Sequence, residues 1–194
     1  MKELFLMRHG ITWENKAHIF IGQNDPPLIN EAIVEINTIR PYVVKPEVIY
    51  SSDLKRAFET AKLLFPKQKI ILLPQLRERH WGSLQGKPRS ILRETNERQH
   101  TGNDALYRNA GAETLQSMIS RIKYVLNIIK KTNANSILIL SHGTYLSYFI
   151  NFILSEKVLR RPLNNLHYHK VLFDNQGNIK EIIFNQNWLN KKND

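Results

Sequence analysis

The sequence predicts an α/β fold, in which a mostly parallel central sheet lies between two layers of helices and carries an antiparallel edge near the C-terminus. Short apolar runs without polar–apolar alternation indicate strands covered on both faces, and helical patterns separate these runs. Two late apolar runs flank a turn-forming stretch, which predicts the antiparallel edge. We expect this three-layer α/β/α domain to occupy residues 1–194, with the polar residues 86–112 as a small lid over one face.

The apolar runs are the clearest strand signals in the chain. Each is only three or four residues long, and each is bounded by polar or turn-forming residues. Two later runs, residues 167–173 and 179–184, are joined by Asp174-Asn175-Gln176-Gly177-Asn178, whose chemistry is typical of a hairpin. In chain order the four expected parallel strands lie at residues 4–7, 48–50, 70–73 and 137–140.

Three segments between the strands place apolar residues at helical spacing. Residues 30–44 form the first expected helix, and Pro41 limits it near its end. The second covers residues 53–65, where Asp53 is of a type that caps helix N-termini. The third covers residues 113–131, with one apolar stripe formed by Leu115, Ile119, Ile122, Val125 and Ile129.

One long uncharged stretch raises the alternative of a membrane span. No Asp, Glu, Lys or Arg occurs between Thr132 and Ser155, a length that could cross a bilayer. Polar residues and a glycine interrupt the stretch, and a bilayer helix tolerates them poorly. We therefore expect a buried strand followed by a buried helix, and no membrane partner. The interrupting residues are Asn133, Asn135, Ser141, His142, Gly143 and Asn151.

Composition narrows the function classes. The chain has no cysteine, which removes disulfides, thiolate nucleophiles and cysteine-bound zinc, and fits a cytoplasmic location. The net charge of +11 is spread over both halves of the chain, without an arginine-rich run. Such a charge attracts anionic ligands in general. We expect it to serve solubility and steering, and expect no specific nucleic-acid partner.

Reactive groups follow three of the expected parallel strands. The first strand runs into Arg8-His9-Gly10, the second into Ser51-Ser52-Asp53, and the fourth into Ser141-His142-Gly143. In parallel α/β sheets, ligands bind beyond the carboxyl ends of the strands. A single histidine of this kind is more often a buried packing residue. Two histidines at two strand ends, with an arginine beside one of them, indicate a functional site.

Metal binding and phosphoryl chemistry are the two interpretations of this site. His9 and His142 could ligate zinc, but a third ligand would be needed and Arg8 would repel the dication. Arginine presents a planar fork that matches phosphate oxygens, and histidine can act as a covalent nucleophile. The residues therefore favour phosphoryl chemistry without a metal.

These strand ends, with the segments between them, resemble the signature of a known family. The stretch Leu6-Met7-Arg8-His9-Gly10-Ile11-Thr12, followed by Asn15, looks like the first motif of the histidine phosphatase superfamily, in its phosphoglycerate mutase-like branch (branch 1). The resemblance continues in order along nearly the whole chain. The further matching segments are Gly22 to Leu28, Ser51 to Ala57 with Thr60 and Ala61, Leu76 to Gly82 closed by Gly86, Gly111 to Thr114 with Arg121, and Ser141 to Gly143.

The resemblance implies a role for each matching residue. His9 would be the nucleophile that becomes phosphohistidine, while Arg8, Arg56 and His142 would surround the phosphoryl oxygens. His142 would act as the imidazolium, which a nearby bound dianion favours. Glu78 would protonate the leaving oxygen and then help to activate water. Asn15, Gly22 and Gly143 would complete the phosphate pocket, and neither a metal nor another cofactor would be needed.

Phosphatase and mutase share the first half-reaction and differ in what accepts the phosphoryl group from His9. The segment from Glu78 to Gly86 is similar to the mutase version, with Trp81 where mutases have tyrosine. Cofactor-dependent mutases carry a long insertion after this segment, whereas only 26 residues separate Gly86 from Glu113 here. We therefore expect a phosphatase acting on a small phosphorylated metabolite, with phosphoglycerate mutase as the alternative.

The sequence also leaves broader alternatives open. A non-catalytic phosphate-binding protein would need Arg8 and Arg56 but neither His9 nor Glu78. A nucleic-acid-binding protein would rest on the net charge alone. The identity of the phosphomonoester stays open, and a homodimer is one of the oligomeric states that the sequence allows.

Overall fold

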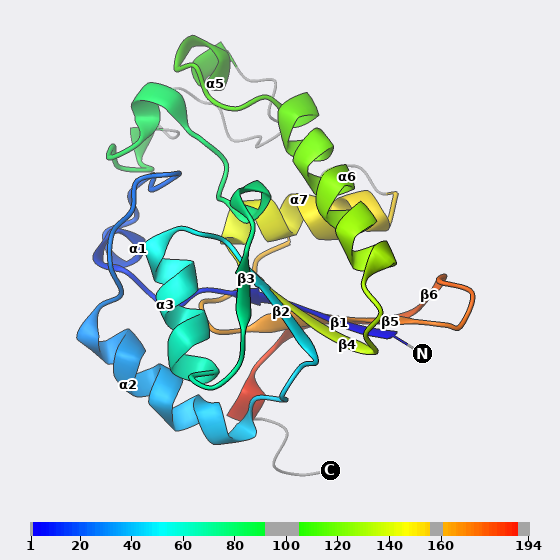
Figure 1. Cartoon of the computed structure of the whole chain (residues 1–194). Helices are drawn as coiled ribbons and strands as arrows, with labels where there is room; N and C mark the ends of the chain where they lie inside the picture. Colours follow the sequence, from blue (N-terminus) through cyan, green and yellow to red (C-terminus); the bar gives the residue numbers. More distant parts are fainter. Residues whose placement is uncertain (1, 92–104, 156–160, 190–194) are drawn as a thin grey trace.

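The computed structural model describes residues 2–91, 105–155 and 161–189. Its six strands form one sheet in the order β3-β2-β4-β1-β5-β6. The first four pair in parallel, whereas β5 is antiparallel to both β1 and β6 (Figure 1). The predicted mostly parallel sheet with its late antiparallel edge is therefore confirmed. The strands are β1 (Lys2–Arg8), β2 (Val48–Ser51), β3 (Ile70–Leu72), β4 (Ser136–Ser141), β5 (Tyr168–Phe173) and β6 (Ile179–Gln186).

Helices cover both faces of this sheet. One face packs against α2 (Asn30–Ile39) and α3 (Lys55–Leu64), and the other packs against α6 (Leu115–Lys131) and α7 (Gly143–Ile153) (Figure 1). These are the three layers that the alternating pattern predicts. The remaining short elements are α1 (Trp13–Lys16), α5 (Ala105–Asn109) and the 3-10 turns η1 (Arg40–Tyr42), η2 (Pro74–Leu76) and η3 (Gly82–Leu84).

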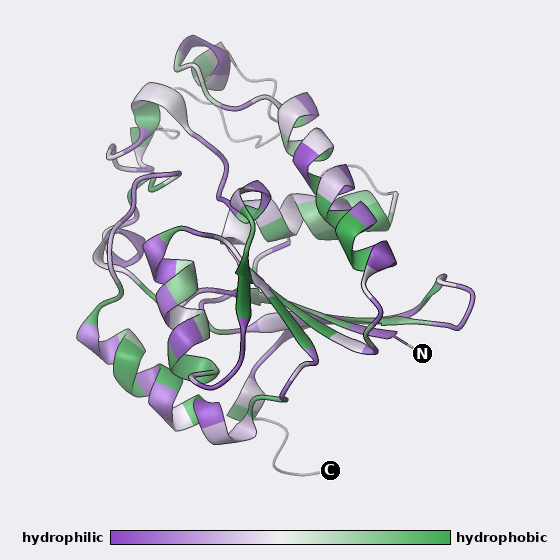
Figure 2. Ribbon diagram, viewed as in Figure 1, coloured by the Kyte–Doolittle hydropathy of each residue, from purple (hydrophilic) through white to green (hydrophobic). Residues whose placement is uncertain are grey.

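The apolar run of β1 shows why the central strands lack alternation. Leu4 and Leu6 pack into the core under α6 and α7, while Phe5 and Met7 pack into the core under α2 and α3. Because successive side chains point to opposite faces, a strand covered on both sides needs apolar residues throughout. Figure 2 shows the resulting hydrophobic sheet between helices with one apolar and one polar side.

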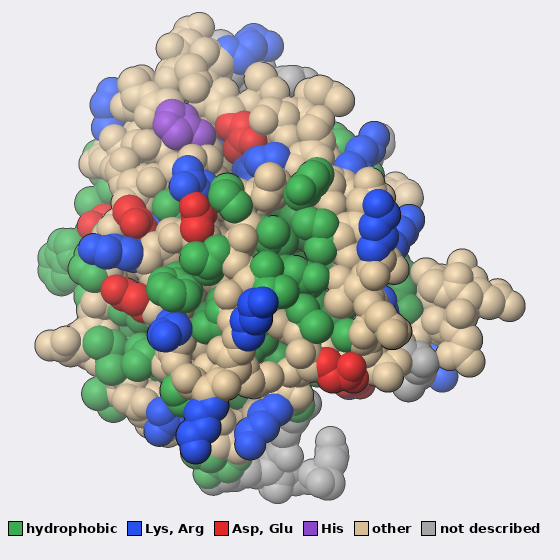
Figure 3. Space-filling view, viewed as in Figure 1, with side chains coloured by type: hydrophobic (Ala, Val, Ile, Leu, Met, Phe, Trp, Pro, Cys, Tyr) green, Lys and Arg blue, Asp and Glu red, His purple; other side chains and the backbone are tan. Residues whose placement is uncertain are grey.

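The outer strand β3 departs from the expectation that all four parallel strands are covered on both faces. Ile71 and Leu72 are 36% and 41% exposed, because β3 is an edge strand that pairs only with β2. Apolar side chains are accordingly gathered on the face that β3 presents in Figure 3.

The predicted helix at residues 53–65 begins later than expected, and Asp53 does not cap it. Helix α3 starts at Lys55, whose backbone N–H donates to the carboxylate of Asp25 at 2.6 Å. Asp53 instead accepts two hydrogen bonds from the guanidinium of Arg77, at 2.8 and 2.6 Å. This long-range ion pair overrides the local capping preference of the aspartate.

The other two predicted helices form with shorter bounds. Helix α2 ends at Ile39 and continues as the 3-10 turn that contains Pro41, since proline cannot donate to the helical ladder. Helix α6 begins at Leu115, where the hydroxyl of Thr114 accepts from the Ser117 N–H at 3.2 Å.

The uncharged stretch at 132–155 folds as predicted into a buried strand and a buried helix, β4 and α7. Within the described ranges, no helix is long and apolar enough to cross a membrane. The cytoplasmic location stays a prediction.

A third, smaller cluster lies apart from the two sheet cores. It joins Phe20, Trp81, Leu84 and Tyr107, and the Arg79 guanidinium lies 4.7 Å from the centre of the Trp81 ring. The cluster connects the segment after β3 with the described ends of the predicted lid at 86–112. Residues 92–104 of that lid lie outside the described residues.

Gly82 allows the segment that carries Trp81 and Leu84 to lie directly against the backbone of Ala110. Gly82 has φ +58°, and a Cβ there would collide with the backbone of Ala110, whose carbonyl accepts from the Ser83 N–H. We expect Gly82→Ala to lower the free energy of unfolding by about 3 kcal/mol, because it combines backbone strain with a backbone collision. Urea denaturation measures this.

The matched control is Gly86→Ala. Gly86 also has a positive φ, +84°, but nothing lies within 4 Å of its built Cβ. This variant should cost only about 1 kcal/mol. Equal losses in the two variants would show that the close approach to Ala110 contributes nothing.

Candidate active site

Sheet register brings the two histidines together. In the β1–β4 ladder Arg8 is the partner of Ser141. His9 follows Arg8 and His142 follows Ser141, so the two histidines lie at equivalent positions just beyond the paired residues. The centroids of their rings are 5.0 Å apart, and both side chains are buried. Strand β2 ends beside them, since Ser51 is the partner of Leu140 in the β2–β4 ladder. The three reactive strand ends therefore form one site.

Hydrogen bonds fix the tautomer of His9. Its Nδ1 lies 2.6 Å from the carbonyl oxygen of Gly10, which can only accept, so Nδ1 carries the proton. Nε2 accepts from the Nε of Arg56 at 3.2 Å. Burial, followed by the charges of Arg56 and Arg8, holds the pKa of His9 well below its ordinary value. The ring is thus neutral at neutral pH, with a lone pair on Nε2.

His142 is held by a residue that the sequence analysis placed at a strand end without giving it a role. Its Nε2 lies 2.9 Å from the hydroxyl of Ser52, which follows β2. Burial, then the charge of Arg56, holds the pKa of His142 well below its ordinary value. The protein groups alone therefore favour neutral His142. The imidazolium expected from the family resemblance requires the opposing charge of a bound anion.

Arg56, at the start of α3, is buried and connects His9 to the loop after α1. Its Nη1 and Nη2 donate to the carbonyls of Asn24 and Gly22, at 2.7 and 2.8 Å. Burial lowers its pKa to about 10, and the charge of Glu78 is the largest opposing influence. Arg56 consequently remains charged at neutral pH.

Arg8 lies against the first turn of α7. A Cβ on residue 143 would lie 3.3 Å from the Nε of Arg8, so Gly143 permits this close approach. The Nη1 of Arg8 donates to the carbonyl of Leu163 at 2.8 Å, and the side-chain amide of Asn165 donates to the carbonyl of His9 at 2.9 Å. Leu163 and Asn165 belong to a late loop that carries no sequence signal for this role.

Glu78 is anchored to the N-terminus of α7. Its carboxylate accepts from the N–H groups of Arg79 and Tyr145, both at 2.9 Å, and of Thr144 at 3.1 Å. The side chain of Arg77, the residue before Glu78, pairs with Asp53 instead. Glu78 therefore stands beside the helix that begins immediately after His142.

Asn15 has a local structural partner in this site. Its side-chain oxygen accepts from the Thr12 N–H at 3.1 Å, which forms a capping box at α1. The amide of Asn165 also lies within 3.5 Å of this oxygen. The side-chain oxygen of Asn15 thus accepts a hydrogen bond from the backbone. The contribution of Asn15 to a phosphate pocket stays a prediction.

Comparison with known proteins assigns the chain to a family. The model of the histidine phosphatase superfamily (branch 1) matches residues 4–185. The chain belongs to this superfamily. The resemblance drawn from the sequence motifs is therefore confirmed.

Relatives of this chain include both phosphatases and mutases. A metal-independent phosphoserine phosphatase from Arabidopsis thaliana is 30% identical over 155 residues, covering 73% of this chain and 64% of that protein. A 2,3-bisphosphoglycerate-dependent phosphoglycerate mutase from Bifidobacterium longum (strain DJO10A) is 33% identical over 101 residues, covering 47% of this chain. The aligned part spans only 41% of the length of that mutase.

Solved structures share the fold of this chain. A phosphoglycerate mutase from Bacillus anthracis superposes with a TM-score of 0.82 at 22% identity, over 97% of this chain and 94% of that chain. A phosphoserine phosphatase from Entamoeba histolytica, solved with 3-phosphoglyceric acid, superposes with a TM-score of 0.79 at 22% identity. That match covers 96% of this chain and 98% of the other.

Buried histidines make the stability of the protein depend on pH. The pKa values of His9, His142 and His169 are all lowered chiefly by burial, that of His169 to about 4. Below pH 6.5 the unfolded chain binds protons that the folded chain does not. The free energy of unfolding therefore decreases as the pH is lowered. We expect a slope approaching about 4 kcal/mol per pH unit from the three groups together.

Urea denaturation between pH 7 and 5.5 measures this slope. His169→Gln, which removes one of the three groups away from the site, should reduce it by about a third. Stability that rises on acidification, or a slope that this variant leaves unchanged, would contradict the assignment.

Proposed function

We propose that this chain hydrolyses the phosphomonoester of a small metabolite through a phosphohistidine formed on His9. The observation that carries the proposal is the locked tautomer, because Nδ1–H binds the Gly10 carbonyl and leaves the Nε2 lone pair beside Arg56. A neutral, oriented imidazole among cations is the state that a nucleophile toward phosphorus needs.

In the first step Nε2 of His9 attacks phosphorus, and the bond between phosphorus and the ester oxygen breaks. The phosphorylated ring becomes cationic, and the hydrogen bond from Nδ1 to the Gly10 carbonyl stabilises it. Arg8 and Arg56 offset the charge on the phosphoryl oxygens. His142 joins them as a donor, its proton favoured by the bound dianion.

Glu78 handles the proton in both steps. Its protonated form gives the proton to the leaving oxygen, which departs as an alcohol. The resulting carboxylate then takes a proton from water as that water attacks phosphorus and the Nε2–phosphorus bond breaks. Inorganic phosphate is released, and His9 and Glu78 return to their starting states.

The proton role of Glu78 predicts a dependence on the leaving group. Glu78→Gln should lower kcat/KM for phenyl phosphate by about a hundredfold, because the phenolate needs a proton as it leaves. p-Nitrophenyl phosphate should lose much less, since p-nitrophenolate is a stable anion. Steady-state kinetics with both esters measure the difference, and equal losses would rule out Glu78 as the acid.

Two observations favour hydrolysis over phosphoryl transfer between substrate oxygens. Only 26 residues separate Gly86 from Glu113, which is short for a lid that must exclude water. The Arabidopsis thaliana phosphoserine phosphatase also aligns over 73% of this chain, against 47% for the Bifidobacterium longum mutase. The mutase remains the second candidate because its aligned segment is the more similar of the two, at 33% identity.

The deciding experiment is hydrolysis of p-nitrophenyl phosphate in EDTA between mildly acidic and neutral pH, followed by a panel of phosphomonoesters. We expect EDTA-resistant release of phosphate. Conversion of 3-phosphoglycerate in the presence of 2,3-bisphosphoglycerate, with no hydrolysis of any ester, would favour the mutase. Failure of both reactions would favour a phosphate-binding protein. The single-domain organisation and a homodimer stay predictions.

A further inference from the structure

We propose that Glu113 and Arg121 form a positioning clamp that sets the place of the Glu78 carboxylate and thereby the efficiency of proton transfer to the leaving oxygen. The inference rests on the proposed role of Glu78 as the general acid. Neither Glu113 nor Arg121 is placed among the groups that touch the phosphoryl oxygens. They act through the backbone that carries Glu78.

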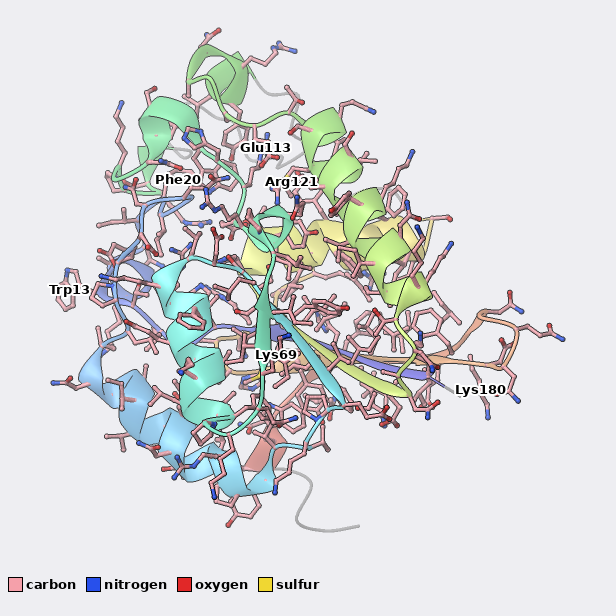
Figure 4. All side chains as sticks on the ribbon, in the orientation of Figure 1. Trp13, Phe20, Lys69, Glu113, Arg121 and Lys180 are labelled. Atoms are coloured by element: carbon pink, nitrogen blue, oxygen red, sulfur yellow. The ribbon has the colours of Figure 1, made fainter. Side chains whose placement is uncertain are left out.

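The clamp is a two-pronged ion pair at the start of α6. The Nε of Arg121 donates to one carboxylate oxygen of Glu113 at 2.8 Å, and Nη2 donates to the other at 2.7 Å. The side chains are only 18% and 10% exposed. Figure 4 shows both residues between α6 and the segment that leaves β3. Such a planar, bidentate pair fixes orientation as well as distance.

Arg121 holds the backbone before Glu78. Its Nη1 donates to the carbonyls of Gln75 and Arg77, at 2.6 and 2.9 Å. Arg77 is the residue directly before Glu78, so this hydrogen bond restrains the peptide from which the Glu78 side chain departs.

Glu113 holds the backbone after Glu78. Its N–H donates to the carbonyl of His80 at 2.8 Å, and its carboxylate accepts from the His80 N–H at 3.4 Å. The Nε of Arg79 donates to the carbonyl of Glu113 at 2.9 Å. The two members of the ion pair therefore bind the backbone on either side of Glu78 in the chain.

The clamp also contacts the surface on which the Glu78 carboxylate rests. The Arg121 guanidinium lies 5.0 Å from the centre of the Tyr145 ring, and the Tyr145 N–H donates to Glu78. The guanidinium of Arg121 thus contacts both the backbone before Glu78 and the residue whose N–H binds the Glu78 carboxylate. Displacements well below 1 Å matter for proton transfer, so loosening this contact should affect the acid before it affects phosphate binding.

The test compares leaving groups in Arg121→Lys, which keeps the charge but loses the fork. Phenyl phosphate should lose about tenfold more kcat/KM than p-nitrophenyl phosphate, while inhibition by inorganic phosphate stays near its original value. Lys170→Gln is the control, because it breaks another half-buried ion pair, with Glu3, between β5 and β1. This variant should treat both esters alike.

Glu113→Gln provides a second, milder variant that preserves side-chain shape, and the same differential is expected. Equal losses with both esters would reduce the pair to a structural ion pair and overturn the inference. If Glu78→Gln itself shows no leaving-group dependence, the acid role fails and the clamp fails with it. If Glu78→Gln shows the dependence and neither clamp variant does, the proposed function stands and only the clamp is rejected.

Discussion

His9→Ala is expected to abolish phosphate release, with kcat lower by a thousandfold or more, because no other group replaces the Nε2 lone pair. The fold should persist, because His9 lies just beyond the paired residues of β1 and its side chain takes no part in the β1–β4 ladder. Circular dichroism and phosphate release measure the two properties. Rapid quenching should trap an acid-labile, alkali-stable phosphoryl adduct in the parent protein and none in the variant.

His18→Asn is the matched control for this experiment. His18 is exposed in a turn with φ +54°, a conformation that asparagine adopts readily, so activity should remain. An adduct that persists in His9→Ala would place the covalent step on another residue and remove the central element of the proposed function.

Arg56→Ala has the second-largest expected effect, on both activity and stability. Loss of the buried guanidinium should lower kcat/KM by about a hundredfold to a thousandfold, because under the proposed function its charge offsets that of the phosphoryl oxygens. It also leaves the carbonyls of Gly22 and Asn24 without their donor, which should lower the free energy of unfolding by about 2 kcal/mol or more.

Arg56→Lys separates charge from geometry, since a lysine keeps the positive charge but cannot reach three acceptors at once. We expect activity between that of Arg56→Ala and the parent, with most of the stability loss retained. Lys55→Ala, at the exposed neighbouring position on α3, should change neither property. Kinetics and urea denaturation of the three variants test the assignment, which fails if Arg56→Lys behaves as the parent does.

The sequence predicts the architecture well because local pattern and tertiary structure agree there. The runs at β1 and β4 are apolar throughout since both of their faces are buried, and the Asp174–Asn178 stretch turns the late hairpin. Asp53 was misassigned because its partner, Arg77, is distant in the chain. The exposure of β3 was missed since edge position depends on strand order, which a single strand does not encode.

In the candidate site, too, local motifs could be predicted from the sequence and contacts between distant segments could not. His9, Arg56, Glu78 and His142 stand at recognisable motif positions, and the structure brings them to one edge of the sheet. Supporting contacts could not be predicted, because they are made by ordinary backbone atoms or isolated polar residues from distant segments. They include Ser52 at His142, Leu163 at Arg8 and Asn165 at the His9 carbonyl.

The position of β1 in the sheet also bears on how the protein is made. Residues 3–8 of β1 each pair in β4 with a residue 133 positions later, and β5 lies later still. A nascent chain therefore carries the apolar strand β1 unpaired until most of the sequence has emerged, a high-contact-order arrangement that folds slowly and exposes the strand to aggregation. His9 and His142 are separated by the same interval. Pairing of β1 with β4 therefore also brings the two histidines of the candidate site together.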